Sequence, residues 1–424
     1  MRLLMVFMAF NLIVMIHELG HFTVAKLAGI KVKEFSLFVG PRLFGFTKGE
    51  TTYSLRLFPI LAYVKMEGEE EESESERAFI NKPVWVRAAV IAAGPLANLF
   101  LAFLIITIVY SATGYNTRVV SQVDVDSAAY NMGIKSGDKI VGYANKHIYD
   151  PTEVILFLHI TKGEPTQIKI KRDGKTIKTD ITPKIERDYH LGFYANNVEG
   201  ETNIISDFIS GSPAEKAGMQ QGDKIVSLND IGVTSIEEIK AVLRENGEAA
   251  IDVYFERQGR REILNITPEY SENYSLGIMF SRADGGGLFG TMGSAAGFTF
   301  SNIRMVPYSL YWLITGKVSF RDMTGPVGIV STMNEVAKSS ETFMDAFLNI
   351  LLWTGLISAA IGATNLVPFP ALDGSKLLIL IIEGVSRKKI PADKEAVIAS
   401  IGFFILIGLS IFVMANDIMR FIVK

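Results

Sequence analysis

The sequence predicts a polytopic α-helical membrane protein with four transmembrane helices and two tandem, mainly β domains between the second and third helices. Two observations predict this fold class. Apolar residues make up 49% of the 424 residues, and they gather in four runs of the length that crosses a bilayer, about 20 residues. The polar segment between the second and third runs contains an internal duplication. This pattern excludes a soluble globular chain and a disordered one.

Each apolar run predicts one membrane-spanning helix. The runs extend over residues 3–25, 88–109, 346–366 and 396–415. A cleaved signal peptide is the alternative for the first run, because Arg2 precedes it. No small-x-small cleavage site follows that run, and it ends in ionisable residues, so we expect it to remain as a helix.

The distribution of charge predicts the orientation in the membrane. Short loops rich in Lys and Arg stay in the cytoplasm, and residues 26–82 hold nine Lys and Arg residues while residues 387–394 hold four. The long polar segment and the two termini are therefore expected on the opposite side. The net charge of −3 gives no reason to expect a nucleic-acid partner. The absence of cysteine excludes disulfides, thiolate metal ligands and a cysteine nucleophile.

The polar segment repeats itself with an offset of 85 residues. Gly-Asp-Lys-Ile-Val occurs at residues 137–141 and again at residues 222–226, and Ile-Thr-Pro occurs at 181–183 and 266–268. In the same register, Leu191, Gly192 and Phe193 correspond to Leu276, Gly277 and Ile278. Several landmarks in one register indicate a duplicated domain. We predict two domains, residues 116–200 and residues 201–284.

Each repeat predicts a strand, a short helix, a Gly-Asp turn, a strand, a second helix and further strands. This pattern resembles the circularly permuted PDZ domain of bacteria. By that resemblance, the carboxylate-binding loops are Leu191-Gly192-Phe193 and Leu276-Gly277-Ile278. PDZ domains capture peptide ends by adding them to a sheet edge. The alternative is that both domains are spacers with blocked grooves.

The first apolar run ends in a metal-binding pattern, His17-Glu18-Leu19-Gly20-His21. Helical residues four apart lie about 40° apart around the axis, so both imidazoles point at one place. They could hold Zn²⁺ there, with Glu18 as the general base. Ionisable groups in an apolar run are costly and functional by default. The alternative is a helix end that emerges into water.

A third ligand is expected from another membrane segment, because catalytic zinc usually takes three protein ligands. The other three histidines all lie in the polar segment. The third run ends at Asn365, and Pro368 and Pro370 then break the helix. Unwound backbone at membrane depth is tolerated only inside protein or along a wet cavity. Asp373 is the acid in this stretch, with a helix-capping role as the alternative.

These motifs together resemble the site-2 protease family of intramembrane zinc metalloproteases, and within it the bacterial regulator-of-sigma-E protease group. The resemblance covers essentially the whole chain. It consists of His-Glu-Leu-Gly-His in the first run, Asn-x-x-Pro-x-Pro-x-Leu-Asp-Gly after the third, the two PDZ-like repeats, and Gly94-Pro95-x-x-Asn98 in the second run. The combination is far more specific than any one of these motifs.

The resemblance implies roles for particular residues. The zinc ligands would be His17, His21 and Asp373, Glu18 would activate water, and Asn365 would contact the substrate backbone. Residues 58–66 resemble the family's membrane-associated β-loop, so Tyr63, Val64 and Lys65 are expected to bind substrate. The chain departs from the family at Leu61-Ala62 and at Ser375-Lys376. Asn98 is expected to pack helices, with a polar role near the metal as the alternative.

The resemblance also implies the reaction and its place. We expect zinc-dependent hydrolysis of a peptide bond within or beside the membrane-spanning helix of a single-span protein, an anti-sigma factor already trimmed outside the membrane. The chain would lie in the bacterial inner (cytoplasmic) membrane with its PDZ domains in the periplasm, and would act in an envelope stress response. Residues 1–112 and 343–424 would form the membrane part, with an amphipathic periplasmic segment at 285–342.

Two other classes of function, a membrane scaffold and a zinc transporter, fit the sequence less well than a protease. A catalytically idle scaffold does not require Glu18 together with Asp373, and a zinc transporter requires a second polar metal site along the helices, which the sequence lacks. The PDZ pair could recruit trimmed substrates or exclude bulky ones. Exclusion is favoured, because His190 and Ser275 stand where PDZ ligand loops often have glycine.

Overall fold

The computed structural model describes residues 2–69, 71, 73–198, 201–209, 211–284, 287–320, 323–340, 342–388 and 390–422. The chain divides into two compact units. The helical unit comprises Met1–Thr117 and Arg282–Met414, and the β-rich unit comprises Arg118–Ser281 with Ala415–Lys424. Gly200 and Gly285, at which two predicted domain boundaries fall, lie outside the described residues.

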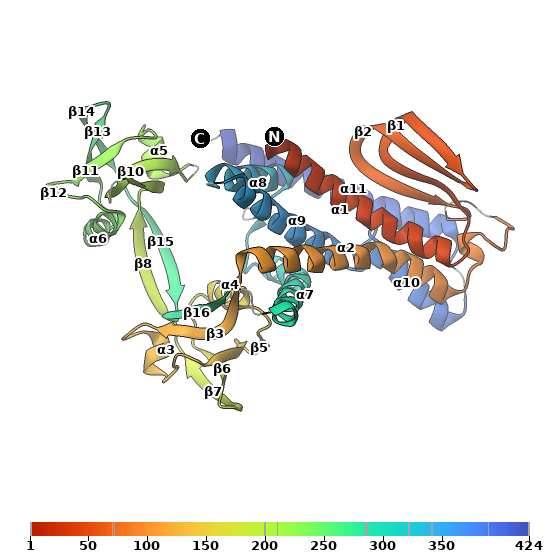
Figure 1. The fold of residues 1–424 in the computed structure, drawn as a ribbon, viewed down its shortest axis with the longest axis horizontal. Helices are drawn as coiled ribbons and strands as arrows, with labels where there is room; N and C mark the ends of the chain where they lie inside the picture. Colours follow the sequence, from red (N-terminus) through yellow and green to blue (C-terminus); the bar gives the residue numbers. More distant parts are fainter. Residues whose placement is uncertain are drawn as a thin grey trace. The chain divides into compact units, whose positions relative to one another are not determined.

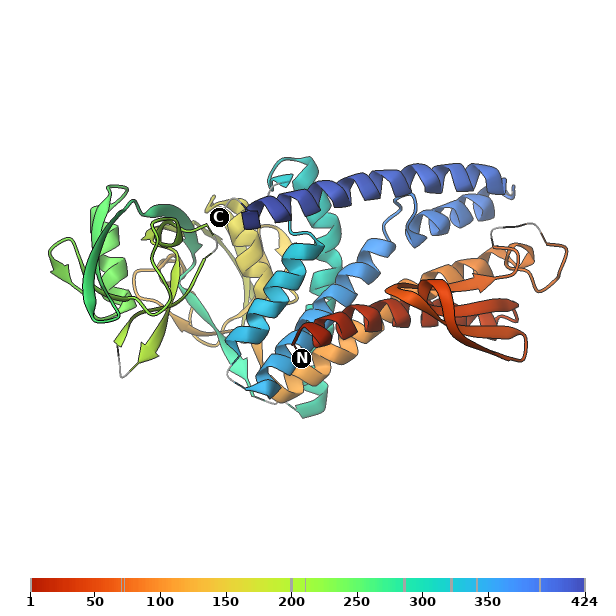
Figure 2. The ribbon, with the colours of Figure 1, turned by 90° about the horizontal axis from the view of Figure 1, so that it is seen from above.

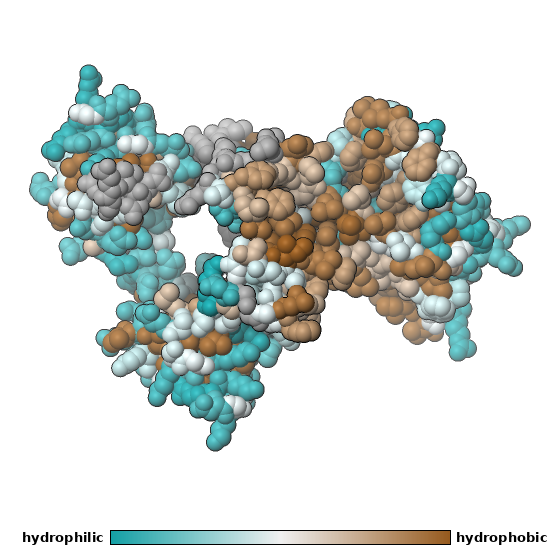
Figure 3. Space-filling view, in the orientation of Figure 1, coloured by the Kyte–Doolittle hydropathy of each residue, from teal (hydrophilic) through white to brown (hydrophobic). Residues whose placement is uncertain are grey.

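Four helices of the described chain are long and apolar enough to span a membrane, as predicted. They are α1 (Arg2–Leu27), α2 (Val84–Thr113), α9 (Phe343–Asn365) and α11 (Ala392–Ile422), and their apolar stretches are Leu4–Leu27, Val84–Thr113, Phe343–Asn365 and Lys394–Met419. α1, α2 and α9 lie side by side (Figures 1 and 2). Apolar residues dominate the visible surface of the helical unit, whereas hydrophilic ones dominate that of the β-rich unit (Figure 3).

Small residues let these helices approach closely. A Cβ added to Gly20 of α1 would lie 2.4 Å from the carbonyl oxygen of Ala93 in α2. A Cβ on Gly362 of α9 would lie 2.8 Å from the carbonyl oxygen of Pro95. Without a hydrophobic driving force between helices in lipid, such close backbone packing is what stabilises their association.

Three further helices complete the helical unit: α7 (Gly287–Ile314), α8 (Pro326–Ser339) and α10 (Asp373–Ser386). Ala295 and Phe298 of α7 pack in one apolar cluster with residues of α2 and α9. Met333 and Ala337 of α8 pack against α1 and α9. Helices α7 and α8 thus occupy most of the segment that the sequence predicts as amphipathic.

The loop between α1 and α2 contains two long antiparallel strands, β1 (Val32–Lys48) and β2 (Thr51–Met66). The first part of β1, residues 32–37, pairs both with residues 62–66 and with residues 52–55 of β2. The later part of β1 pairs with residues 51–56. The chain bends between these parts at Phe38 and Gly40, both with positive φ. The result is a small sheet with residues 62–66 along one edge.

The described strands of the β-rich unit form two six-stranded sheets and one two-stranded sheet. From the first repeat come β3 (Tyr115–Val123), α3 (Ala128–Asn131), β4 (Lys139–Tyr143), β5 (Lys146–His147), α4 (Pro151–Thr161), β6 (Thr166–Arg172), β7 (Lys175–Ile181), β8 (Lys184–His190) and β9 (Phe193–Val198). From the second come β10 (Glu201–Phe208), α5 (Pro213–Lys216), β11 (Lys224–Leu228), β12 (Ile231–Gly232), α6 (Ile236–Asn246), β13 (Ile251–Arg257), β14 (Arg260–Ile266), β15 (Glu269–Ser275) and β16 (Ile278–Ala283).

The final strands of the two repeats are exchanged. One sheet has the order β16-β3-β4-β6-β7, and the other has the order β14-β13-β11-β10-β9. The strand β8 pairs with β15 as the chain leaves the first sheet and returns to it. The predicted boundary between residues 200 and 201 therefore falls between β9 and β10, which pair with each other.

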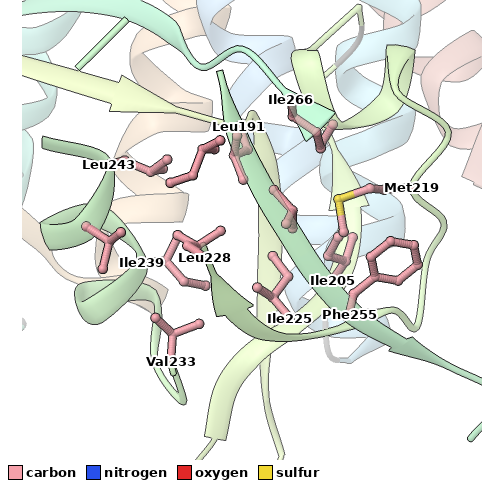
Figure 4. Packing of buried hydrophobic residues seen from close by; sticks show 14 residues of the cluster. Leu191, Ile205, Met219, Ile225, Leu228, Val233, Ile239, Leu243, Phe255 and Ile266 are labelled. Atoms are coloured by element: carbon pink, nitrogen blue, oxygen red, sulfur yellow. The ribbon is translucent and has the colours of Figure 1, made fainter. Parts of the chain in front are cut away.

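Backbone contacts explain this exchange. The carbonyl of Leu276 accepts from Ala129 N–H of the first repeat, whereas the carbonyl of Leu191 accepts from Ala214 N–H of the second. Leu191 also lies in the apolar core of the second sheet, beside Ile205 and Leu243 (Figure 4). The loop Leu276-Gly277-Ile278, which the sequence placed in the second domain, thus belongs to the first sheet.

The same buried ion pair stabilises the Gly-Asp turn of both repeats. Arg172 donates two bonds to Asp138, and Arg257 donates two bonds to Asp223, with each aspartate 1% exposed. Burial alone would raise the pKa of Asp138, but the bonds from Arg172 outweigh it and hold this pKa below its usual value.

Candidate metal centre

Three potential ligand atoms meet where α1 faces the start of α10. Nε2 of His17 lies 3.2 Å from Nε2 of His21 and 3.2 Å from Oδ2 of Asp373. Nε2 of His21 lies 3.5 Å from the same oxygen. These residues form the one group of three or more metal-ligating side chains found in the described part of the chain. The residues predicted from the sequence therefore lie together.

The separations fit a tetrahedral metal ion. With metal–ligand bonds of about 2.0–2.2 Å, two ligands of a tetrahedral zinc lie about 3.4 Å apart. The three observed distances, 3.2, 3.2 and 3.5 Å, bracket this value. Two imidazoles and one carboxylate would fill three of four positions and leave the fourth open, which is the arrangement of catalytic rather than structural zinc.

The hydrogen-bonding groups around the site also indicate a bound cation. Nδ1 of His21 lies 2.9 Å from the carbonyl oxygen of Val90 in α2. A carbonyl can only accept, so Nδ1 carries the proton and Nε2 presents a lone pair. Oδ2 of Asp373 is a buried oxygen without a hydrogen-bond partner among the described residues. Acceptors that face one another in this way require a positive charge between them.

The local sequence explains why Asp373 reaches α1. Helix α9 ends at Asn365, and the next helix, α10, begins at Asp373 itself. Between them, Pro368 and Pro370 prevent a continuous helix. A Cβ on Gly374 would lie 2.2 Å from the carbonyl oxygen of Val367, so only glycine lets α10 start this close to the end of α9.

A cavity of about 220 Å³ opens at the ligand atoms. Glu18 lines it together with the three ligand residues, and so do Tyr63 and Val64 from the edge of the β1–β2 sheet. An adjoining hollow of about 440 Å³ is lined by the same two residues and by Lys65. The arrangement places an acid, a strand edge and a metal-binding group around one space.

Asn365 and Asn98 differ in their relation to this cavity. Asn365 is half-buried at the end of α9 and is not among the described side chains that line it. Asn98 of α2 is fully buried, and its side-chain amide lies 3.3 Å from Nδ1 of His17. From the sequence, helix packing is the expected role of Asn98, with a polar role near the metal as the alternative; the structure places its amide against a ligand residue.

Sequence reasoning missed two further features of the site. Lys376, in the first turn of α10, pairs with Glu69 at 3.1 Å, and both residues line the cavity. Gly94 lies opposite His21: an added Cβ would be 2.3 Å from its Nε2. Gly94 and Asn98 stand out in the otherwise apolar second run and could have drawn attention to it. Their contacts with the histidines depend on how α2 faces α1, which the sequence does not show.

Comparison with known proteins assigns the family. The model of peptidase family M50 matches residues 5–409. The chain belongs to peptidase family M50. The metalloprotease class predicted from the sequence, that of the site-2 proteases, is thereby confirmed.

Relatives of this M50 chain match over nearly its full length. A zinc metalloprotease RasP of Oceanobacillus iheyensis is 30% identical and covers 97% of each chain. A putative zinc metalloprotease of Clostridium acetobutylicum is 28% identical over 97% of this chain and 95% of its own. The regulator of sigma-W protease RasP of Bacillus subtilis is 27% identical over 97% and 96%.

Among solved structures, the PDZ domain of HtrA3 bound to a phage-derived ligand covers 21% of this M50 chain and 93% of its own. It is 16% identical, with a TM-score of 0.18. A likeness this low does not assign a fold.

Proposed function

We propose that this M50 protein is an intramembrane zinc endopeptidase that hydrolyses a peptide bond within or beside the transmembrane helix of a single-span protein. One observation carries the proposal. His17, His21 and Asp373 converge with zinc-like separations at the end of a membrane-spanning helix, and Glu18 lines the same cavity.

Each residue of the site has a part in the reaction. His17, His21 and Asp373 would hold a zinc ion, which when bound would supply an activated water and polarise the scissile carbonyl. Glu18 takes the proton from that water and then gives it to the leaving amine. Tyr63 and Val64 line the space in front of these groups and position the substrate backbone.

The β1–β2 sheet presents the substrate to the site. A transmembrane helix hides its carbonyls in its own hydrogen bonds, so it must unwind before it can be cut. Residues 62–66 form an edge of the sheet, and an unwound segment could pair there as an added strand. Lys65 of this edge and Asn365 at the end of α9 would then contact the substrate backbone.

The proposed substrate class is supported by a relative. The name of the B. subtilis relative, regulator of sigma-W protease, supports an anti-sigma factor as substrate. We place the chain in the bacterial cytoplasmic membrane, with residues 26–82, which hold nine Lys and Arg residues, inside the cell and the β-rich unit outside.

Each of the two six-stranded sheets, with its helices, is proposed to be a PDZ-like domain. The strands β9 and β16 are edge strands, and each follows a Leu-Gly loop, at Leu191-Gly192 or at Leu276-Gly277. These edges could bind a peptide, but we favour a role in excluding substrates with large outer domains.

The test uses the purified protein in liposomes with two single-span substrates, one of which carries a folded outer domain. We expect zinc-dependent cleavage inside the transmembrane segment of the trimmed substrate, located by mass spectrometry, and little cleavage of the other. Val64→Pro removes the N–H that a pairing strand donates and should impair cleavage, whereas Val64→Ala should not. Cleavage confined to soluble peptides would contradict the proposal.

A further inference from the structure

Asn98 is a buried polar side chain in an otherwise apolar helix. It is 0% exposed, and its side-chain amide lies 3.3 Å from Nδ1 of His17. The amide oxygen Oδ1 has no hydrogen-bond partner among the described residues. Burying an amide without its hydrogen bonds is strongly unfavourable in an apolar medium. A packing role alone does not offset this cost, because leucine would fill similar space.

The orientation of the His17 ring identifies the hydrogen bond that Asn98 can make. Nε2 of His17 faces His21 and Asp373, and Nδ1 faces Asn98. If Nε2 is to offer a lone pair to a metal, Nδ1 must carry the proton and needs an acceptor. An asparagine amide turned by 180° occupies the same space with its oxygen and nitrogen exchanged. The turned amide puts Oδ1 beside Nδ1.

We propose that Asn98 is a positioning residue: its Oδ1 accepts the Nδ1–H of His17 and holds the imidazole in the tautomer whose Nε2 is free to bind metal. The inference rests on the proposed function for its metal. The corresponding partner of His21 is the carbonyl of Val90, at 2.9 Å.

One face of α2 therefore fixes both imidazoles. Val90, Gly94 and Asn98 are spaced four residues apart and share a face of the helix. Val90 accepts from His21, Gly94 leaves room for the His21 ring, and Asn98 lies against Nδ1 of His17, from which its turned amide would accept. The backbone of Asn98 is fixed in turn, since its carbonyl accepts from Ser358 of α9 at 2.8 Å.

The test measures zinc affinity of the full-length protein by competition with a chelator, together with the unfolding temperature of the metal-free protein. Asn98→Leu removes the acceptor at similar volume and should weaken zinc binding about 10- to 100-fold. Asn98→Asp keeps an acceptor oxygen and should retain affinity within a few-fold. Thr354→Val, the control, removes a buried hydroxyl of α9 that donates to Ile350 of its own helix and should leave zinc binding unchanged.

A second measurement observes the tautomer itself. In zinc-loaded protein with ¹⁵N-labelled histidine, His17 should show a protonated Nδ1 in the wild type and a mixture of the two tautomers in Asn98→Leu. Equal losses of affinity in Asn98→Leu and Asn98→Asp, or none in either, would overturn the proposal. So would a wild-type His17 protonated on Nε2. A wild type that binds no zinc at all would instead refute the proposed function.

Discussion

Gly94→Ala is a small change at the centre of the site. In the structure, the added Cβ would lie 2.3 Å from Nε2, 2.6 Å from Cε1 and 2.8 Å from Cδ2 of His21. Ordinary contacts begin near 3.4 Å, so the ring must move by about 1 Å. It cannot swing aside freely, because Nδ1 is bonded to Val90 and the nearby Gly20 holds α1 close to α2.

A displacement of about 1 Å in a catalytic group costs about 100-fold in rate. We therefore expect Gly94→Ala to lower kcat/KM about 100-fold and to weaken zinc binding. Helix propensity alone predicts the opposite, a gain in stability of about 0.5–1 kcal/mol. Cleavage of the trimmed substrate and zinc affinity are the assays. Gly408→Ala in α11, where the added Cβ meets nothing within 4 Å, is the control and should keep both. Wild-type turnover in Gly94→Ala would refute the packing argument.

Two further predictions concern buried ion pairs. Arg87 of α2 donates to Glu383 of α10 at 2.7 Å, and both side chains are under 10% exposed. Glu383→Gln should therefore lower the free energy of unfolding by about 3–5 kcal/mol. An unchanged denaturant midpoint would contradict this. Asp138→Asn should destabilise the first sheet at pH 7, measured by hydrogen exchange at the Ile140 amide. Because the pKa of Asp138 is lowered by folding, its contribution is lost as pH falls below about 4, so variant and wild type should converge there. A difference in hydrogen-exchange protection between variant and wild type that persists at low pH would show that the charge of Asp138 does not cause the stabilisation.

The membrane helices could be predicted because their signal is local. Twenty apolar residues need no partner to be recognised, and the His17–His21 spacing fixes a shared helix face. Asp373 was found because two prolines force the chain to unwind just before it. Each of these inferences uses covalent geometry or composition within one short segment.

The strand exchange and the surroundings of the metal centre could not be predicted in the same way. Both repeats carry the same pattern, so nothing local says whether β9 pairs with its own repeat or the next. The contact of Asn98 with His17 depends on how far α2 is turned about its axis. The pairing of Lys376 with Glu69 joins residues from segments far apart in the chain, which a single sequence does not reveal.

The central claim is that His17, His21 and Asp373 hold the zinc with which Glu18 hydrolyses a peptide bond. The most direct test measures bound zinc and cleavage of a trimmed single-span substrate in Glu18→Gln beside the wild type. Glu18→Gln keeps the shape of the side chain but removes the base, so the account predicts one zinc per chain and no turnover. Asp373→Ala should lose both zinc and turnover. Cleavage by Glu18→Gln at the wild-type rate, or full zinc content in Asp373→Ala, would contradict the account.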